Sequence, residues 1–168
     1  MEQHSQPITI QRARPSSAER IAAFICQAQP GASPVSPERV RAHLGRTGLL
    51  LAEMDGNLVG ILGWQVENFV SRVTDFLITP PRLRSVAGRA LLEAMEAISR
   101  ELECETALLL MRKQPSEQDM EFWREFGYEL REVAALPRAW QEAACEGASG
   151  DEWALLKPLR EDRVRQPI

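Results

Sequence analysis

Residues 75–92 read DFLITPPRLRSVAGRALL, and this stretch decides our prediction of the fold. β-branched and aromatic residues at positions 73–78 are typical of a strand, which Pro80 and Pro81 end. Apolar residues then recur with helical spacing at Leu91, Met95, Ile98 and Leu102. The stretch therefore predicts a strand that passes through a short loop into a long helix.

The loop between this strand and this helix is a candidate anion site. The N-terminus of a helix presents unpaired N–H groups and the positive end of the helix dipole, which together bind phosphate. Arg82, Arg84 and Arg89 lie in or beside the loop. The alternative is an ordinary connection whose arginines are only solvated.

The run from Phe76 to Ala94 resembles the acetyl-CoA-binding motif of the GNAT family of N-acetyltransferases. In that family a strand ending in a hydrophobic-x-Pro sequence leads into Arg/Gln-x-x-Gly-x-Gly/Ala and a helix, whose amides receive the CoA pyrophosphate. Aligned without gaps, Pro80 takes the place of the proline and Gly88 that of the last glycine. The resemblance implies acetyl-CoA as the acetyl donor.

Three positions of the loop depart from the motif. Leu83 stands where arginine or glutamine is usual, Arg84 where a glycine is common, and Val86 where the first motif glycine is usual. Glycine lets a backbone approach a ligand closely, and the branched side chain of Val86 narrows that approach. We therefore expect a degenerate acetyl-CoA-binding loop.

The order of the predicted elements resembles the same family from Ile8 to Tyr128. It implies an α+β fold with a twisted, mostly antiparallel sheet of about six or seven strands flanked by about four helices. The strand that holds Asp75 is expected beside the strand that begins at Thr106. The expected strands are 8–14, 49–54, 58–66, 71–78, 106–111, 128–136 and 153–159. The other expected helices are capped by Ser16 or Ser17 and run to 29, by Ser36 and run to 44, and by Ser116 and run to 126.

Two local signals are expected in the second and third strands. Asp55-Gly56 predicts a two-residue turn between them. Gly60 and Gly63 predict a bulge or a close backbone contact in the third strand.

Composition predicts one soluble cytoplasmic domain over residues 1–168, with frayed ends at 1–6 and 160–168. The chain has a net charge of −4 and is 44% hydrophobic and 26% charged, which is ordinary for a globular protein. This balance gives no bulk preference for nucleic acid or membrane, and no apolar run is long enough for a span. Three scattered cysteines, Cys26, Cys104 and Cys145, predict buried thiols and neither a disulfide framework nor a metal site.

Acetyl transfer to an amine, as the resemblance implies, needs a held thioester, a neutral amine and a proton source. Asp75, or Glu67 acting through water, is the candidate base, although strand alternation can equally turn Asp75 to solvent. The two histidines, His4 and His43, are expected at the surface. The residues expected to hold acetyl-CoA are the strand edge Leu77, Ile78 and Thr79, and the loop residues Arg84, Ser85, Val86, Ala87, Gly88 and Arg89.

Residues 121–128, EFWREFGY, resemble the family's segment beside the acetyl-CoA thiol. On this match Trp123 occupies the position of the general-acid tyrosine, and an indole supplies no titratable proton. Tyr128, the single tyrosine of the chain, is expected in the core.

Two functions therefore stay open. One is an active N-acetyltransferase on an amine of a small molecule or protein. The other is a non-catalytic module of the same fold that serves in binding, regulation or assembly. The inserted segment 137–150 predicts a short helix, in which Trp140 either closes the substrate cleft or makes a contact in a homodimer. The sequence does not identify the acceptor.

Overall fold

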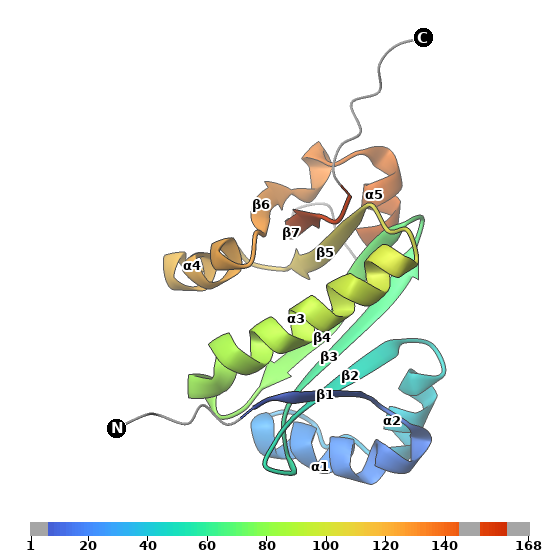
Figure 1. The fold of residues 1–168 in the computed structure, drawn as a ribbon. Helices are drawn as coiled ribbons and strands as arrows, with labels where there is room; N and C mark the ends of the chain where they lie inside the picture. Colours follow the sequence, from blue (N-terminus) through green and yellow to red (C-terminus); the bar gives the residue numbers. More distant parts are fainter. Residues whose placement is uncertain (1–6, 145–151, 161–168) are drawn as a thin grey trace. The chain divides into compact units, whose positions relative to one another are not determined.

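The computed structural model describes residues 7–144 and 152–160 (Figure 1). Its strands are β1 Thr9–Arg12, β2 Gly48–Met54, β3 Asn57–Glu67, β4 Val70–Ile78, β5 Thr106–Met111, β6 Glu129–Glu132 and β7 Trp153–Pro158. Its α-helices are α1 Ala18–Ala28, α2 Pro37–Leu44, α3 Arg84–Glu101, α4 Glu117–Glu125 and α5 Arg138–Ala144. Single 3-10 turns precede α1 at Pro15–Ser17, precede α3 at Pro81–Leu83 and follow β6 at Val133–Ala135.

The seven strands form one mixed sheet in the order β1-β2-β3-β4-β5-β7-β6. β4 and β5 are parallel, whereas the pairs β1–β2, β2–β3, β5–β7 and β6–β7 are antiparallel. This topology confirms the predicted α+β fold, including the adjacency of the strands that hold Asp75 and Thr106. Helix α5 confirms the short helix predicted in the inserted segment and brings the α-helices of the described residues to five.

Tertiary contacts group the chain into two compact units. The first comprises Met1–Gln65 and Thr74–Met95, and the second comprises Val66–Val73 and Glu96–Ile168. Of the ends expected to fray, residues 1–6 and 161–168 lie outside the described residues, as does the part of the insertion from 145 to 151.

In the first unit, β2 and β3 form a hairpin around Asp55 and Gly56. Both turn residues have positive φ, at 52° and 76°, and the flanking Met54 and Asn57 are paired. This is the two-residue turn that Asp-Gly predicts, because these residues tolerate the left-handed region. The hairpin fixes which residues of each strand face each side of the sheet.

One face of this unit is covered by α1 and α2. The strands contribute alternate residues to this face, Leu49 and Leu51 of β2 and Ile61 of β3. These side chains pack with three residues of the helices, Ile21, Phe24 and Val40. On the other face, Gly60 leaves space for α3, because a Cβ atom at residue 60 would lie 3.0 Å from Cδ1 of Leu91. The predicted irregularity near Gly60 is confirmed by a register shift of β2 against β3 at Ala52 and Glu53.

The two helices of this face begin differently. Ser36 caps α2 as predicted, since its Oγ atom accepts from the amide of Arg39 at 3.2 Å and Pro37 follows it. The predicted cap of α1 is wrong. Ser17 precedes α1 with φ −88° and ψ −1°, the helical region, and makes no capping bond. The preceding 3-10 turn holds Ser17 in that conformation, whereas a capping serine needs an extended one.

In the second unit, β5, β7 and β6 pack with α5. The core contains Leu108 of β5, Leu156 of β7, and Val133 and Leu136, which follow β6. The predicted strand 128–136 is too long, because it ends at Glu132 and continues as a 3-10 turn. The turn lets Val133 and Leu136, three residues apart, both enter the core.

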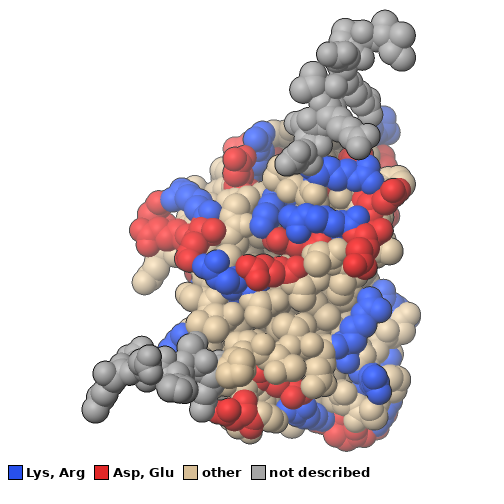
Figure 2. Space-filling model, in the orientation of Figure 1, with Lys and Arg blue, Asp and Glu red and all other residues tan. Residues whose placement is uncertain are grey.

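Acidic and basic side chains are interspersed on the face of the molecule shown in Figure 2. Of the cysteines, Cys104 is buried as predicted, and Cys145 lies outside the described residues. The prediction of a buried thiol is wrong for Cys26, which is exposed. Burial raises the pKa of the Cys104 thiol. None of the helices that the structure describes is long and apolar enough to cross a membrane.

Candidate functional site

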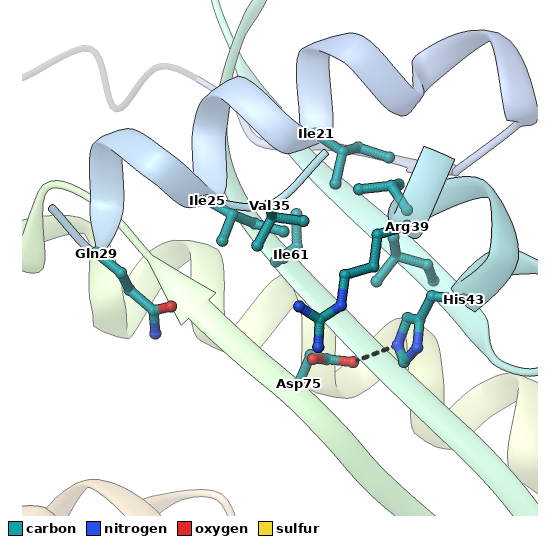
Figure 3. Close-up of a pocket in the computed structure, with 10 residues that line it drawn as sticks. Ile21, Ile25, Gln29, Val35, Arg39, His43, Ile61 and Asp75 are labelled. Carbon is teal, nitrogen blue, oxygen red and sulfur yellow. Dashed lines mark hydrogen bonds and ion pairs between the residues drawn. The ribbon is translucent and has the colours of Figure 1, made fainter. Parts of the chain in front are cut away.

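A pocket opens in the first unit where α1 and α2 cover the sheet (Figure 3). Its volume is about 320 Å³, at the lower end of the range of about 300–1,000 Å³ that is usual for small-molecule sites. Its walls are mainly apolar, formed by Ile21, Ile25, Val35, Val40, Leu49 and Ile61. Its polar lining residues are Gln29, Arg39, His43 and Asp75. The pocket therefore suits a small molecule that is apolar along most of its length.

Strand alternation brings Asp75 of β4 to this face of the sheet. The neighbouring position on β3 is Gly63, where an added Cβ atom would collide with Oδ2 of Asp75 and lie 2.8 Å from Oγ1 of Thr74. The absence of a side chain at residue 63 thus leaves the space in which the carboxylate lies. The sequence left open whether Asp75 faces solvent, and the structure places it in the wall of the pocket.

His43 of α2 contacts the Asp75 carboxylate. The distance from its Nε2 atom to Oδ2 of Asp75 is 2.9 Å, and the same oxygen accepts from Oγ1 of Thr74 at 2.8 Å. The two side chains are 43% and 40% exposed, and ion pairs that are this exposed contribute only about 0–1 kcal/mol to stability. The contact therefore matters mainly for the orientation of the two side chains.

The end of α2 holds the backbone of His43 in place. The hydroxyl of Thr47, a buried residue, donates to the carbonyl of His43 at 2.7 Å, and the amide of Thr47 donates to the same oxygen at 3.0 Å. These bonds satisfy a carbonyl that the helix itself leaves without a partner. They also fix the point from which the imidazole extends toward Asp75.

Arg39 lies one turn before His43 on α2. Residues four apart share one face of a helix, so Arg39 and His43 extend in the same direction, and Figure 3 shows both reaching toward Asp75. Within residues 7–144 and 152–160, the Arg39 guanidinium forms no ion pair or hydrogen bond. The pocket thus holds a carboxylate, an imidazole and a guanidinium at one end of an apolar wall.

The other predicted base, Glu67, does not line this pocket. It is the last residue of β3, it is exposed, and it belongs to the second unit. Sequence reasoning selected Asp75 but treated His43 as a surface residue. The sequence did contain one signal: Arg39 and His43 are four residues apart on a capped helix, so both side chains lie on the same side of α2. Nothing in the sequence near His43 indicates its partner, which lies 32 residues away.

The predicted acetyl-CoA residues occupy the end of β4 and the beginning of α3. The amide of Thr79 donates to the carbonyl of Val59, and the amides of Leu83 and Arg84 donate to Pro80 and Pro81. These three amides are therefore occupied within the chain. The first turn of α3 also contains Ser85 and Val86, and amides in a first turn are the usual donors to an anion.

Two departures from the motif differ in their surroundings. Leu83 is buried at 8% exposure, so its side chain is part of the core. Val86 is 47% exposed at the first turn of α3. The valine side chain is therefore at the surface, whereas the leucine side chain is buried. Ala87 and Gly88 are buried, and Ser85 and Arg89 are exposed.

The aromatic segment of α4 lies in the core of the second unit. Trp123 is 2% exposed and packs edge to face on Tyr128, with ring centres 5.2 Å apart. The Tyr128 hydroxyl donates to Oε1 of Glu96 at 3.0 Å, and Lys157 donates to Oε2 at 2.9 Å. Burial, and then the charge of Glu96, raise the pKa of Tyr128 well above its ordinary value. Tyr128 is thus a core residue, as predicted.

Comparison with solved structures identifies this architecture in N-acetyltransferases. The PaiA N-acetyltransferase of Thermoplasma acidophilum, solved with coenzyme A, has a TM-score of 0.66 at 13% identity, over 90% of this chain and 99% of that one. A GNAT-family acetyltransferase of Staphylococcus aureus Mu50 has a TM-score of 0.69 at 17% identity, over 92% of this chain and 100% of that one. At these low identities, the TM-scores establish a common fold.

The structure of the ribosomal-protein-S18-alanine N-acetyltransferase of Escherichia coli matches this chain about as well as the two structures above. Its TM-score is 0.66 at 17% identity, and the match covers 96% of this chain and 100% of that one. No curated protein sequence matches the chain. The family model described as "Acetyltransferase (GNAT) family" matches residues 18–128, which is more than half of the sequence. The protein therefore belongs to the GNAT family of acetyltransferases.

Proposed function

We propose that this protein is an N-acetyltransferase that transfers the acetyl group of acetyl-CoA to an amine bound in the pocket. The observation that carries this proposal is the contact of His43 with Asp75 inside the pocket. A carboxylate that holds an imidazole is a common arrangement for taking a proton from a nucleophile. The family membership supports the choice of acetyl transfer as the reaction.

In the proposed mechanism, Asp75 accepts the Nε2–H of His43 and so selects the tautomer with a lone pair on Nδ1. That nitrogen takes the proton of the incoming ammonium group, and the neutral amine then attacks the thioester carbonyl carbon. A C–N bond forms and the C–S bond breaks. The second proton of the nitrogen passes to solvent, and water supplies a proton to the departing sulfur, because the indole of Trp123 cannot.

Binding of acetyl-CoA is assigned to the end of β4 and the first turn of α3. The amides of Ser85 and Val86 would hold the pyrophosphate, with Arg84 and Arg89 beside them. The strand residues Leu77 to Thr79 would guide the rest of the donor, and Leu77 follows Asp75 by two residues, about 7 Å along a strand. All of these residues belong to the first unit, as the pocket does.

The test is a titration of acetyl-CoA into the protein by calorimetry, followed by mass spectrometry of a panel of amines incubated with both. We expect a binding isotherm and products heavier by one acetyl group. Asp75→Asn and His43→Gln should abolish most of the product without changing the circular dichroism spectrum. Binding without product from any amine would contradict the proposal.

The second candidate function is a non-catalytic module of the same fold. Two observations favour it: the buried Trp123 at the usual position of the proton donor, and the exposed Val86 side chain at the first turn of α3. We place catalysis ahead because backbone amides make the phosphate contacts and because solvent can protonate a thiolate. The same titration separates the two functions, since a module of this kind would bind acetyl-CoA weakly or not at all.

A further inference from the structure

We propose that the acceptor is a free α-amino acid with an apolar side chain. Its amine would lie at His43 and Asp75, and its carboxylate would pair with Arg39. This inference rests on the proposed acetyl transfer and adds the chemical class of the acceptor.

The charges of the pocket favour a ligand that carries both signs. Asp75 and Arg39 are lining residues of opposite charge, and Asp75 already has His43 as a partner. The Arg39 guanidinium has no such partner within the part of the chain that the structure describes. A guanidinium binds a carboxylate through two parallel hydrogen bonds, so a carboxylate is the group that best completes this end of the pocket.

The spacing of the two side chains on α2 matches an α-amino acid. Residues four apart on a helix have Cβ atoms about 5–6 Å apart, so Arg39 and His43 address groups that are close together in the ligand. In an α-amino acid the amine and the carboxylate are bonded to the same carbon atom. A molecule with its carboxylate many bonds from its amine would not reach both side chains without folding back.

The rest of the lining indicates the side chain. Ile25 of α1, Val35 before α2 and Ile61 of β3 line the pocket with apolar surface, and no further charged residue among those that the structure describes lines it. A lysine or glutamate side chain would have to lose its hydration against this wall, which is unfavourable. An aliphatic or aromatic side chain gains free energy from the same burial.

The same features disfavour two other kinds of amine. A polyamine would bring several positive charges beside Arg39, and among the described residues that line the pocket only Asp75 is available to balance them. The first residue of a peptide has the right amine, but its carboxylate is an uncharged amide and would leave Arg39 without an anion. The comparison of a free acid with its amide therefore tests the inference directly.

The experiment compares L-leucine, L-leucinamide and 3-methylbutylamine, which share one apolar side chain and differ at the carboxylate. We expect L-leucine to be acetylated with a kcat/KM at least about tenfold above that of the other two, because a charge-assisted pair is lost in both. Thermal shift should also show L-leucine binding at lower concentration than L-leucinamide, with no acetyl donor present.

Arg39→Gln should remove the preference for the free acid, so that the kcat/KM for L-leucine no longer exceeds that for L-leucinamide. Arg39→Lys should restore part of the preference. The matched control is Arg46→Gln, an exposed arginine just after α2 that does not line the pocket, and it should keep the full preference. Acetyl-CoA titration of each variant verifies that it is folded and binds the donor.

Two results would overturn the inference while leaving the proposed function intact. One is L-leucinamide acetylated as well as L-leucine by the unaltered protein. The other is a preference for the acid that persists in Arg39→Gln. Failure of the proposed function is distinguishable from both, since no amine of any class would then be acetylated.

Discussion

Gly63 and Asp75 share one space on the sheet, because a Cβ atom at residue 63 would collide with the carboxylate oxygen that contacts His43. The shape of the pocket therefore depends on a residue that contributes no side chain to it. This relationship gives the first prediction.

We predict that Gly63→Ala displaces the Asp75 carboxylate and lowers kcat/KM at least about tenfold, since a small misplacement of a catalytic group is costly. The free energy of unfolding should fall by only about 1 kcal/mol, because the oxygen lies at the end of a side chain that can rotate away. Enzyme assays and urea unfolding measure the two effects. Gly31→Ala is the control, since no atom of the described residues lies within 4 Å of a Cβ atom there, and the activity of this variant should not change.

Removal of the imidazole tests the role of His43. His43→Gln should lower kcat/KM by about 10²–10⁴-fold, because the amine then lacks the side chain that takes its proton. Enzyme assays with one amine measure the effect. An unchanged kcat/KM in His43→Gln would assign the proton transfer to another group. Arg46→Ala, on the segment after α2, serves as the matched surface variant.

Removal of the Val86 side chain should tighten acetyl-CoA binding. Val86→Gly clears the first turn of α3, so the phosphate can approach the amides, and we expect Kd to fall several-fold. Ala97→Gly, at an exposed position of the same helix, controls for the helix propensity cost of about 1 kcal/mol. Calorimetric titration of both variants gives the comparison. Equal affinity of Val86→Gly and the unaltered protein would mean that the valine does not obstruct the ligand.

Tyr128 should make the protein less stable at alkaline pH. Its pKa is raised in the folded state by burial and by Glu96, so the unfolded chain releases this proton first, near the ordinary tyrosine pKa of about 10. The stabilisation is complete below that pH and is lost as pH rises above it. Urea unfolding across this range should show a steeper alkaline loss for the unaltered protein than for Tyr128→Phe.

The ultraviolet absorbance of tyrosinate follows the same event directly, because Tyr128 is the single tyrosine of the chain. As the pH is raised, this absorbance should increase at the same pH at which the protein unfolds. Tyrosinate that forms in the folded protein near its ordinary pKa would contradict the burial argument.

The sequence predicted those elements whose signals are local. Asp55-Gly56 specifies a two-residue turn, and Ser36-Pro37 specifies a helix start, because each depends on the conformational preferences of adjacent residues. The end of β6 at Glu132 was not predictable in this way. There the amide of Val133 donates to the carbonyl of Glu152, a partner 19 residues further along the chain.

The site was predicted only in part, for a similar reason. Alternation along β4 did not determine on which face of the sheet the Asp75 side chain lies. In the structure its carboxylate occupies the space beside Gly63, which belongs to another strand. A gap-free alignment also assigned Leu83 to the place of a ligand-binding arginine, whereas its burial shows that it serves the core. Burial and partners across strands are properties of the assembled sheet, which a motif of adjacent residues does not contain.

Helix α2 is eight residues long and begins at its own serine cap, yet it contributes both the guanidinium and the imidazole of the pocket. The proposed acetyl-CoA loop lies elsewhere in the sequence, so substitutions on the pocket side of α2 leave it unchanged. A related protein could thus acquire a different acceptor by replacing one helical turn, the residues from 39 to 43. Divergence of acceptor choice among proteins of this fold would then be concentrated in α2, while the sheet changes slowly.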